Sequence, residues 1–291
     1  MVGLVLEGGG QRCMYSAAII DAMMQHGITV DGIVGVSAGS AFGVNMKSGQ
    51  MGRALRYNKK FCNDPRYTSL KALITTGNLY TEDFCYGTVP RKLDVFDTDA
   101  FTKSPIKYWS VCTDVRTAEP VYLPLTDGGD RDMRIIQASA SMPLVSNVID
   151  VDDMLLLDGG ISDSIPLKWM QEQGYDKNVV ILTQVKGYRK ERSRIVPLLC
   201  RLLLRKYPAI ADALARRHEM YNAQIDYVLD QERKGNIFLI QPKVSTGISR
   251  IERNPEKLQQ QYDLGAADAQ ALIPSLREFI IHNSYFVIHN S

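Results

Sequence analysis

The stretch Gly35-Val36-Ser37-Ala38-Gly39 is a Gly-x-Ser-x-Gly pentapeptide between two segments of different character. The apolar run Gly32-Ile33-Val34 precedes it, and the small or apolar residues 40–44, which a helix accepts, follow it. A strand that ends in a sharp turn at a serine and passes directly into a helix is a nucleophile elbow. We therefore expect Ser37 to stand at a strained turn, for which the two flanking glycines provide room.

The segments around the pentapeptide alternate between strand and helix. Val2–Leu6 predicts a buried strand, Met14–His26 has the apolar spacing of a helix, and Ile33–Val36 predicts a strand before a helix that begins near Ala38. This β–α–β order is typical of a parallel sheet covered by helices. We expect the α/β class, as a three-layer α/β/α arrangement with a mostly parallel central sheet.

The rest of the chain continues the pattern less regularly. Residues 50–105 predict helices and loops broken by prolines, and Lys107–Thr113 with Pro120–Leu125 predict a strand hairpin. Further strands are predicted at Met154–Leu157, Asn178–Val185 and Asn236–Ile240, and helices at Arg131–Ala140, Arg189–Arg233 and Pro255–Asn283, the last with a break near Pro274. We expect an α/β hydrolase domain over residues 1–245, with a helical C-terminal extension, residues 246–291, packed on it and frayed at its end.

Length and composition restrict the class of protein. The 291 residues are 45% hydrophobic, which suits a globular chain with a sizeable core, and the net charge of +2 gives no support to nucleic-acid binding. No apolar run reaches the length of a membrane span, and the N-terminus lacks the features of a signal peptide. We expect a cytoplasmic protein. The five cysteines are scattered without a Cys-x-x-Cys pair, so we expect reduced thiols and no metal site.

A serine nucleophile needs a base and a site for the oxyanion. Asp158 is a candidate base because it follows the apolar run Leu155-Leu156-Leu157 and opens an Asp-Gly-Gly turn. Strand ends converge at one edge of a parallel sheet, and partial burial raises the pKa of a carboxyl toward that of a useful base. A tight turn after a strand is the alternative explanation. The four histidines lie in predicted helices or the tail, which makes each a poor candidate: His26, His218, His282 and His289.

The loop Glu7-Gly8-Gly9-Gly10-Gln11-Arg12 joins the first predicted strand to the first helix. Three glycines can expose several backbone N–H groups toward one point, and the helix N-terminus favours negative charge. Such a loop can hold an oxyanion or a phosphate, with Arg12 as an added cation; a flexible connection is the alternative. A dinucleotide site matches less well: Asp31 lies at a suitable distance, but Cys13 occupies the third glycine position.

Together these elements resemble the patatin-like phospholipases, a family of serine acyl hydrolases. The resemblance covers residues 4–185 in four ordered blocks: Gly8–Arg12, Gly35–Gly39, Ala138-Ser139-Ala140-Ser141-Met142-Pro143 and Asp158-Gly159-Gly160. One position departs from the pattern, because Cys13 stands where the family usually has glycine. If the loop required a positive φ there, the cysteine would strain it and shift the oxyanion donors.

The resemblance implies a patatin-like fold and an enzyme that hydrolyses carboxylic esters of acyl lipids. Ser37 would be the nucleophile and Asp158 the base of a Ser–Asp dyad, without a metal or any other cofactor. The oxyanion would be held by the glycine-rich loop, through Gly8, Gly9, Gly10, Gln11 and Arg12. Two alternatives remain open, namely an acyl-lipid-binding protein with little turnover and nucleotide binding at the glycine loop.

The segment Arg189–Tyr207 places basic residues on both sides of an apolar run, Ile195–Cys200. A helix of this composition is typical of peripheral contact with an anionic lipid surface, here the inner face of the membrane, or of a lid over the site. The alternative is an ordinary helix with its apolar face in the core and its arginines in solvent.

Overall fold

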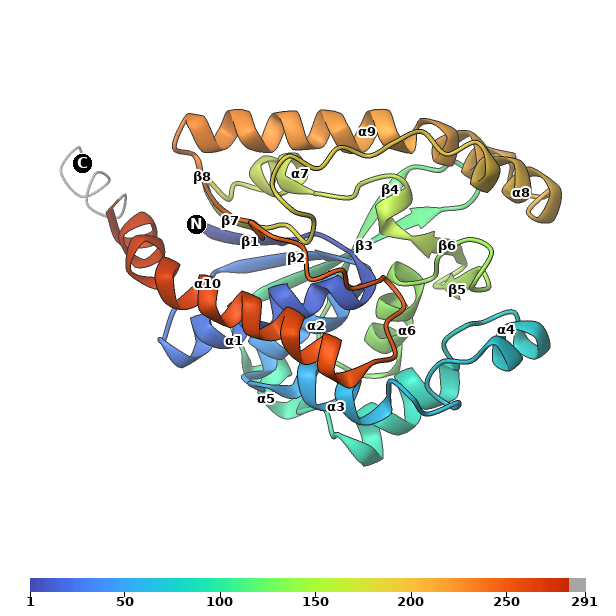
Figure 1. Cartoon of the computed structure of the whole chain (residues 1–291), viewed down its shortest axis with the longest axis horizontal. Helices are drawn as coiled ribbons and strands as arrows, with labels where there is room; N and C mark the ends of the chain where they lie inside the picture. The colour runs from blue at the N-terminus through green and yellow to red at the C-terminus, as the bar shows by residue number, and fades with distance from the viewer. Residues whose placement is uncertain (283–291) are drawn as a thin grey trace.

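The computed structural model describes residues 1–282. An eight-stranded mixed sheet lies at its centre, in the order β5-β6-β3-β2-β1-β7-β8, with β4 also paired to β3 (Figure 1). The strands are β1 (Val2–Leu6), β2 (Gly32–Val36), β3 (Lys107–Asp114), β4 (Pro120–Leu125), β5 (Ile149–Val151), β6 (Met154–Asp158), β7 (Lys177–Ile181) and β8 (Ile237–Ile240).

The middle of the sheet is parallel. β1 pairs in parallel with β2 and β7, β2 with β3, and β7 with β8, whereas β4 and β6 run antiparallel to β3. Successive side chains of β1 point to opposite faces of the sheet: Leu4 and Leu6 enter one hydrophobic core, and Val5 enters the other. All three are fully buried, which explains why β1 lies in the middle of the sheet. The expected α/β class with a mostly parallel sheet is confirmed.

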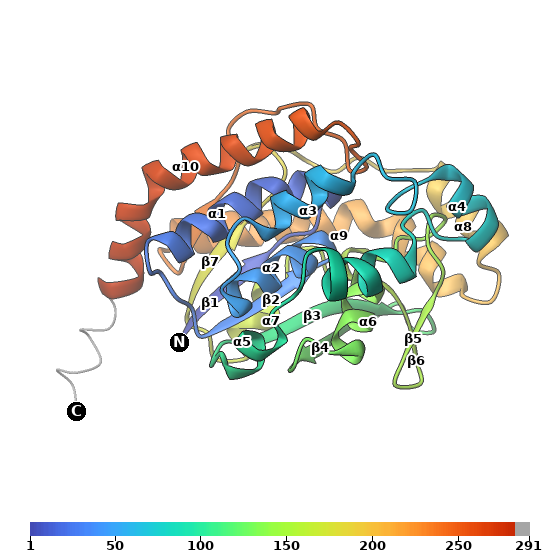
Figure 2. The same ribbon diagram turned by 90° about the horizontal axis from the view of Figure 1, so that it is seen from below.

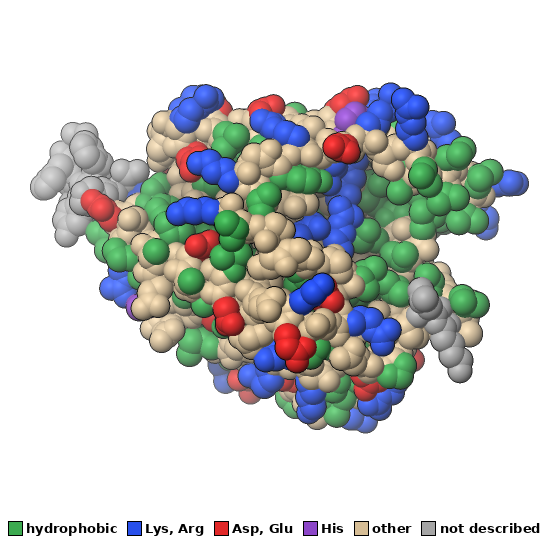
Figure 3. Space-filling model, viewed as in Figure 1, with side chains coloured by type: hydrophobic (Ala, Val, Ile, Leu, Met, Phe, Trp, Pro, Cys, Tyr) green, Lys and Arg blue, Asp and Glu red, His purple; other side chains and the backbone are tan. Residues whose placement is uncertain are grey.

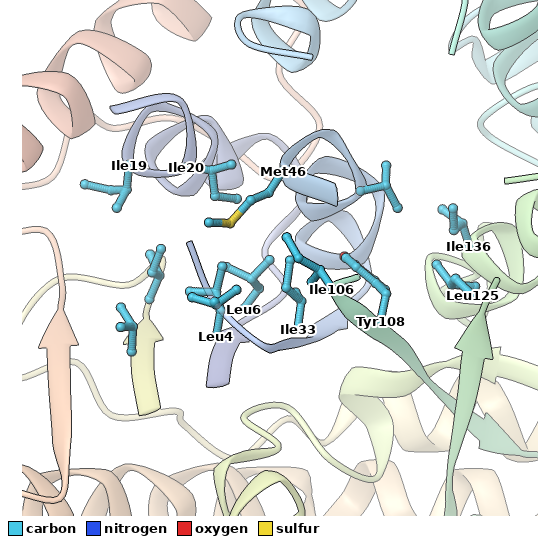
Figure 4. Close-up of a cluster of buried hydrophobic side chains, with 14 of the residues drawn as sticks. Leu4, Leu6, Ile19, Ile20, Ile33, Met46, Ile106, Tyr108, Leu125 and Ile136 are labelled. Atoms are coloured by element: carbon cyan, nitrogen blue, oxygen red, sulfur yellow. The ribbon is translucent and has the colours of Figure 1, made fainter. Parts of the chain in front are cut away.

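Helices cover both faces of the sheet (Figures 1 and 2). One face carries α1 (Met14–Gln25), α2 (Ala38–Ser48) and α10 (Pro255–His282), and the core beneath them includes Leu6, Ile20 and Met46 (Figure 4). The other face carries α7 (Leu167–Glu172) and α9 (Pro208–Arg233). The remaining helices are α3 (Arg53–Phe61), α4 (Leu70–Thr76), α5 (Thr98–Lys103), α6 (Asp130–Ser139), α8 (Ile195–Leu203), and the short or irregular η1 (Gly10–Cys13), η2 (Asp83–Leu93) and η3 (Gly159–Ile161).

Several predicted elements need correction. The helix predicted over Arg189–Arg233 is two helices, α8 and α9, because Pro208 lacks a backbone N–H and begins a new helix. Residues 189–194 precede α8 and are not helical. In contrast, α10 continues through Pro274 without the predicted break, and its residues on both sides of that proline pack into the core. The strand predicted to reach Val185 ends at Ile181, and the three-residue strand β5 was not predicted.

The C-terminal part of the chain is joined closely to the sheet domain. β8 pairs with β7, and α10 packs along α1 (Figure 2). The domain boundary at residue 245 stays a prediction. The predicted frayed end and His289 lie outside the described residues. No helix within residues 1–282 combines the length and apolar character that crossing a membrane requires.

Candidate active site

Ser37 stands where β2 ends and α2 begins. Its φ of 56° and ψ of −127° are unusual for a residue other than glycine, and such backbone strain is concentrated at functional sites. The flanking glycines are required by close packing. A Cβ on Gly35 would lie 2.6 Å from the Cα of Ser40, and a Cβ on Gly39 would lie 2.7 Å from the carbonyl oxygen of Glu7. The chain therefore forms the sharp turn that the pentapeptide predicts.

A second serine supports this turn. The backbone N–H of Ser37 donates to Oγ of Ser139 at 2.9 Å, and Ser139 Oγ donates to the carbonyl of Val111 at 2.6 Å. Ser139 ends α6 and is fully buried. Ser139 lies in the Ala138–Pro143 block of the resemblance, where no role was predicted for it. The contacts show that Ser139 ties the elbow to strand β3.

Asp158 reaches the site from a direction that was not expected. β2 pairs with β3 from Lys107 to Val111, and β6 pairs with β3 from Cys112 onward, running antiparallel. β4 occupies the other edge of β3 along the same residues, so β2 and β6 share one edge and their C-terminal ends meet. The expected convergence of parallel strands is corrected, because β2 and β6 approach end to end and bring Ser37 and Asp158 together.

The environment of Asp158 favours proton acceptance. The residue is 5% exposed, and its Oδ1 accepts a hydrogen bond from the Gly160 N–H at 2.8 Å. Burial raises the pKa of the carboxyl, while the Arg217 guanidinium, a hydrogen bond with the Ser37 side chain and the Gly160 N–H lower it. Burial dominates, so the pKa of Asp158 lies above its ordinary value. A carboxyl of raised pKa is a better base than an exposed aspartate.

The glycine-rich loop packs directly against the elbow. A Cβ on Gly8 would lie 2.9 Å from Cβ of Ser37, and a Cβ on Gly9 would lie 2.6 Å from Oγ1 of Thr183. Gly10 has a φ of 57° and lies against the carbonyl of Arg250, so a side chain fits at none of the three positions.

The backbone donors of this loop differ in availability. The N–H of Gln11 donates to the Arg250 carbonyl at 3.0 Å, so it is engaged within the protein. Among the described residues, no backbone carbonyl accepts a hydrogen bond from the N–H of Gly8, Gly9 or Gly10. A ligand can therefore use these loop donors without breaking a backbone hydrogen bond.

Cys13 causes no strain in the loop. Its φ of −67° and ψ of −2° are helical, so the position does not need the glycine that the family usually has. The side chain is fully buried, and this burial raises the pKa of the thiol far above its ordinary value. A buried thiol of raised pKa is a poor nucleophile.

Ser37 lies at the junction of two cavities. The apolar cavity, about 190 Å³, is lined mainly by aromatic and aliphatic side chains, among them Ala41, Phe42, Tyr57, Tyr86 and Met133. The cationic cavity, about 710 Å³, is lined by Asp158, Gly8–Gly10 and several basic side chains, including Arg12. Of the predicted site residues, Gln11 lines the apolar cavity, and Ser37 and Gly10 line both. Figure 3 shows a hollow on this side of the molecule with Lys and Arg side chains along one wall and hydrophobic side chains on others.

Several residues of the cationic cavity were not assigned to the site from the sequence, and the charged or titratable ones among them include Lys190, Arg217, His218 and Arg250. They come from the segment after β7, from α9 and from the loop before α10. No motif surrounds them, and only the basic character of the predicted 189–233 helix pointed to some of them. His26 and His282 lie at the ends of α1 and α10, as expected.

Comparison with known proteins places this chain in a family. The family model described as patatin-like phospholipase matches residues 4–168, and a domain of unknown function, DUF6363, matches residues 207–281. The chain is 29% identical to the uncharacterized protein YjjU of Escherichia coli K12, over 62% of this chain and 52% of YjjU. It is also 29% identical to lysophospholipase NTE1 of Scheffersomyces stipitis, over 60% of this chain and 11% of NTE1.

The chain thus spans about half the length of YjjU and about a tenth of NTE1. The crystal structure of VipD from Legionella pneumophila is 12% identical, covers 94% of this chain and 66% of VipD, and superposes with a TM-score of 0.46. Because the family model covers more than half of the chain, including the glycine-rich loop, the elbow and Asp158, this protein belongs to the patatin-like phospholipase family.

Proposed function

We propose that this protein hydrolyses carboxylic esters of acyl lipids, with Ser37 as nucleophile and Asp158 as general base. The observation that carries the proposal is the strained Ser37 turn beside a buried carboxyl, at the junction of an apolar and a cationic cavity. Family membership supports a lipid hydrolase in general, and the relatives named NTE1 are lysophospholipases.

The reaction needs only groups of this chain and water. Ser37 Oγ attacks the ester carbonyl carbon while its proton passes to Asp158, and the carbonyl oxygen becomes an oxyanion. The N–H groups of Gly9 and Gly10, with the Arg12 charge nearby, stabilise this oxyanion. Asp158 then returns the proton to the leaving alcohol. Water, deprotonated by Asp158, attacks the acyl-enzyme, which releases the fatty acid and restores Ser37.

The two cavities suggest how the substrate lies. An acyl chain loses unfavourable contact with water in the apolar cavity, whose lining is mostly hydrophobic. The alcohol part of the ester then lies in the cationic cavity on the other side of Ser37. This orientation places the ester carbonyl between the two cavities, beside the glycine-rich loop.

Peripheral contact with an anionic lipid surface through Arg189–Tyr207 is part of the proposal. On α8, Ile195, Leu198, Leu202 and Leu203 are 70%, 59%, 51% and 70% exposed, which does not fit a face packed in the core. Basic residues flank the helix on both sides, and Val196 of α8 lines the cationic cavity. α4, whose Ile74 is 85% exposed, lies at the same end of the molecule (Figures 1 and 2). Exposed apolar side chains with flanking cations suit an anionic membrane surface.

Labelling with a fluorophosphonate probe and ester turnover test the dyad. Wild type and Ser40→Ala should be labelled, because Ser40 lies in neither cavity, whereas Ser37→Ala should not. Asp158→Asn should lose turnover by about a thousandfold or more, since the base is removed. Labelling that survives Ser37→Ala would contradict the nucleophile, and unchanged turnover in Asp158→Asn would contradict the dyad.

A further inference from the structure

Besides Arg189, which pairs with Asp226, four cationic side chains line the cationic cavity: Arg12, Lys190, Arg217 and Arg250. They come from four separate segments, namely the glycine-rich loop, the segment after β7, helix α9 and the loop before α10. The same cavity contains Ser37 and Asp158, so the cations lie in the candidate active site. Basic side chains along the wall of the hollow are visible in Figure 3.

Among the described side chains, these cations have no carboxylate paired with them, although Arg217 donates a hydrogen bond to the Gly160 carbonyl and Lys190 contacts the Tyr221 ring. In the described part of the chain, none of the four forms an ion pair with a carboxylate within 4.0 Å. The two buried carboxylates of the cavity are engaged elsewhere: Glu7 accepts hydrogen bonds from Thr183 and Tyr221, and Asp158 accepts one from Gly160. Glu191, at the same cavity, is exposed.

Two nitrogen atoms at this cavity are also unsatisfied. Nε of Arg12 and Nδ1 of His218 are buried and have no hydrogen-bond partner in residues 1–282. A buried polar group without a partner is costly, and native proteins rarely leave one. Both side chains line the cationic cavity, where the acceptor oxygens of an anion would satisfy the Arg12 Nε–H and, when it carries a proton, the His218 Nδ1.

The cluster carries an electrostatic cost in the absence of an anion. Burial, together with the nearby charges of Arg217 and Arg250, lowers the pKa of Lys190 to about 7. Its Nζ lies 4.5 Å from the ring centroid of Tyr221, a contact that only partly replaces lost hydration. Cations held close together in a partly buried site favour a multiply charged anion.

We propose that the cationic cavity binds a terminal phosphate group, and that the preferred substrates are acyl lipids whose polar part ends in a phosphomonoester. This inference rests on the proposed ester hydrolysis. A phosphomonoester offers up to two negative charges and three acceptor oxygens, which match several converging guanidinium and ammonium groups. A phosphocholine ester adds a quaternary ammonium, which the same cations would repel.

Three substrates with the same acyl chain test the preference: 1-acylglycerol 3-phosphate, 1-acylglycerophosphocholine and 1-monoacylglycerol. Wild type should show at least tenfold higher kcat/KM for the phosphomonoester than for the choline ester. Lys190→Gln and Arg250→Gln should each reduce this ratio about tenfold, the scale of one charge-assisted hydrogen bond. Lys190→Arg keeps the charge and should keep the preference.

Matched controls are the exposed cations Lys243 and Arg116, because their replacement by Gln removes the same charge away from the cavity. Lys243→Gln and Arg116→Gln should leave the ratio unchanged. Equal kcat/KM for the phosphomonoester and the choline ester in wild type would overturn the inference. So would a ratio that Lys190→Gln and the control Lys243→Gln lower equally.

Binding without turnover separates this inference from the proposed function. In Ser37→Ala, calorimetry with 1-acylglycerol 3-phosphate and with inorganic phosphate should detect both ligands, the lipid more tightly, and Lys190→Gln should weaken both. Binding of inorganic phosphate without tighter binding of the lipid would overturn the head-group assignment. If esters are not hydrolysed but this binding is found, the proposed function fails and the subsite stands. If esters are hydrolysed without a preference for the phosphomonoester, the proposed function stands and the phosphate subsite fails.

Discussion

The two cavities that meet at Ser37 differ in where the chain provides them. The apolar cavity is lined mainly by residues 37–146, which lie within the region matched by the patatin-like family model. The cationic cavity takes Lys190, Arg217 and Arg250 from beyond that region, whose last matched residue is 168. The difference teaches that the proposed catalytic groups and the proposed acyl-binding wall lie in the matched region, whereas three of the four cations of the charged wall, all but Arg12, come from later elements. If the proposals hold, changes in these later elements can alter the choice of polar group without altering the catalytic groups.

The largest effect, on kcat, should come from a change that disturbs the Ser37 turn, where the two cavities meet. Ser139→Ala removes the hydrogen bond that holds the Ser37 N–H, and the strained turn can then relax. We expect kcat to fall about tenfold to a hundredfold for charged and neutral esters alike, with little change in KM, because misplacement of a nucleophile acts on the reaction step. Steady-state kinetics and the rate of fluorophosphonate labelling measure this effect.

Ser16→Ala is the matched control for that variant. Ser16 is fully buried, like Ser139, but lies in α1 and lines neither cavity. Its replacement should leave kcat and the labelling rate near those of wild type. A Ser139→Ala protein that folds normally and keeps the wild-type kcat would remove Ser139 from the positioning of Ser37.

The local parts of the fold could be predicted from the sequence. The spacing of apolar residues in Val2–Leu6 and Met14–His26, and the glycines around Ser37, each act within one short segment. These patterns predicted β1, α1, β2 and α2 in the right order. The break at Pro208 was missed because the composition on both sides of it is helical, although a proline at the start of a helix is a common signal.

The candidate site could be predicted only where its residues follow a motif. Asp158 was singled out by its Asp-Gly-Gly turn, but its strand was assumed to be parallel to β2. The direction of β6 depends on its pairing with β3 at Cys112, a contact far along the chain that local pattern does not encode. Arg250 reaches the site through a loop of no regular structure, against Gly10, so no periodicity pointed to it.

The next largest effect should be on membrane binding through α8, since a bound membrane would deliver lipid substrate to both cavities. Leu198→Glu with Leu202→Glu places two charges on the exposed face of α8. A fully buried leucine contributes about 1.5–3 kcal/mol, and partial insertion of two leucines corresponds to about thirtyfold in affinity. We expect binding to anionic vesicles to weaken by about that factor, as measured by co-sedimentation.

One control and one further set of changes define the contact. Val95→Glu changes a similarly exposed apolar residue, 60% exposed, in the segment before α5, and should leave vesicle binding unchanged. Replacement of Arg201, Arg205 and Lys206 by Gln should weaken binding to anionic vesicles and reduce its dependence on salt. If neither the leucine changes nor the basic changes alter the affinity for anionic vesicles, α8 is excluded as the contact.

A smaller effect should be confined to the apolar cavity. Ala41 lines this cavity from α2 and is only partly buried, so a larger side chain there has room to extend into the cavity. Ala41→Leu should displace about two methylene groups of a long acyl chain, at about 0.8 kcal/mol each. We expect the ratio of kcat/KM for long over short acyl esters to fall about tenfold. The preference for a phosphomonoester should stay as in wild type, and a variant that changes this preference instead would contradict the separation of the two cavities.

The smallest effect should be a displacement of the pH profile, which tests whether the charged wall acts on the dyad. Asp158 must be ionised to accept the Ser37 proton, so kcat/KM falls as the pH decreases through the pKa of this carboxyl. The Arg217 guanidinium lowers that pKa, and Arg217→Gln should therefore raise it. With a neutral monoacylglycerol as substrate, the acid limb of kcat/KM should move to higher pH in Arg217→Gln. Arg216→Gln, an exposed neighbour on α9, should keep the wild-type limb. An acid limb that both variants leave in place would mean that the charged wall selects the substrate without tuning its base.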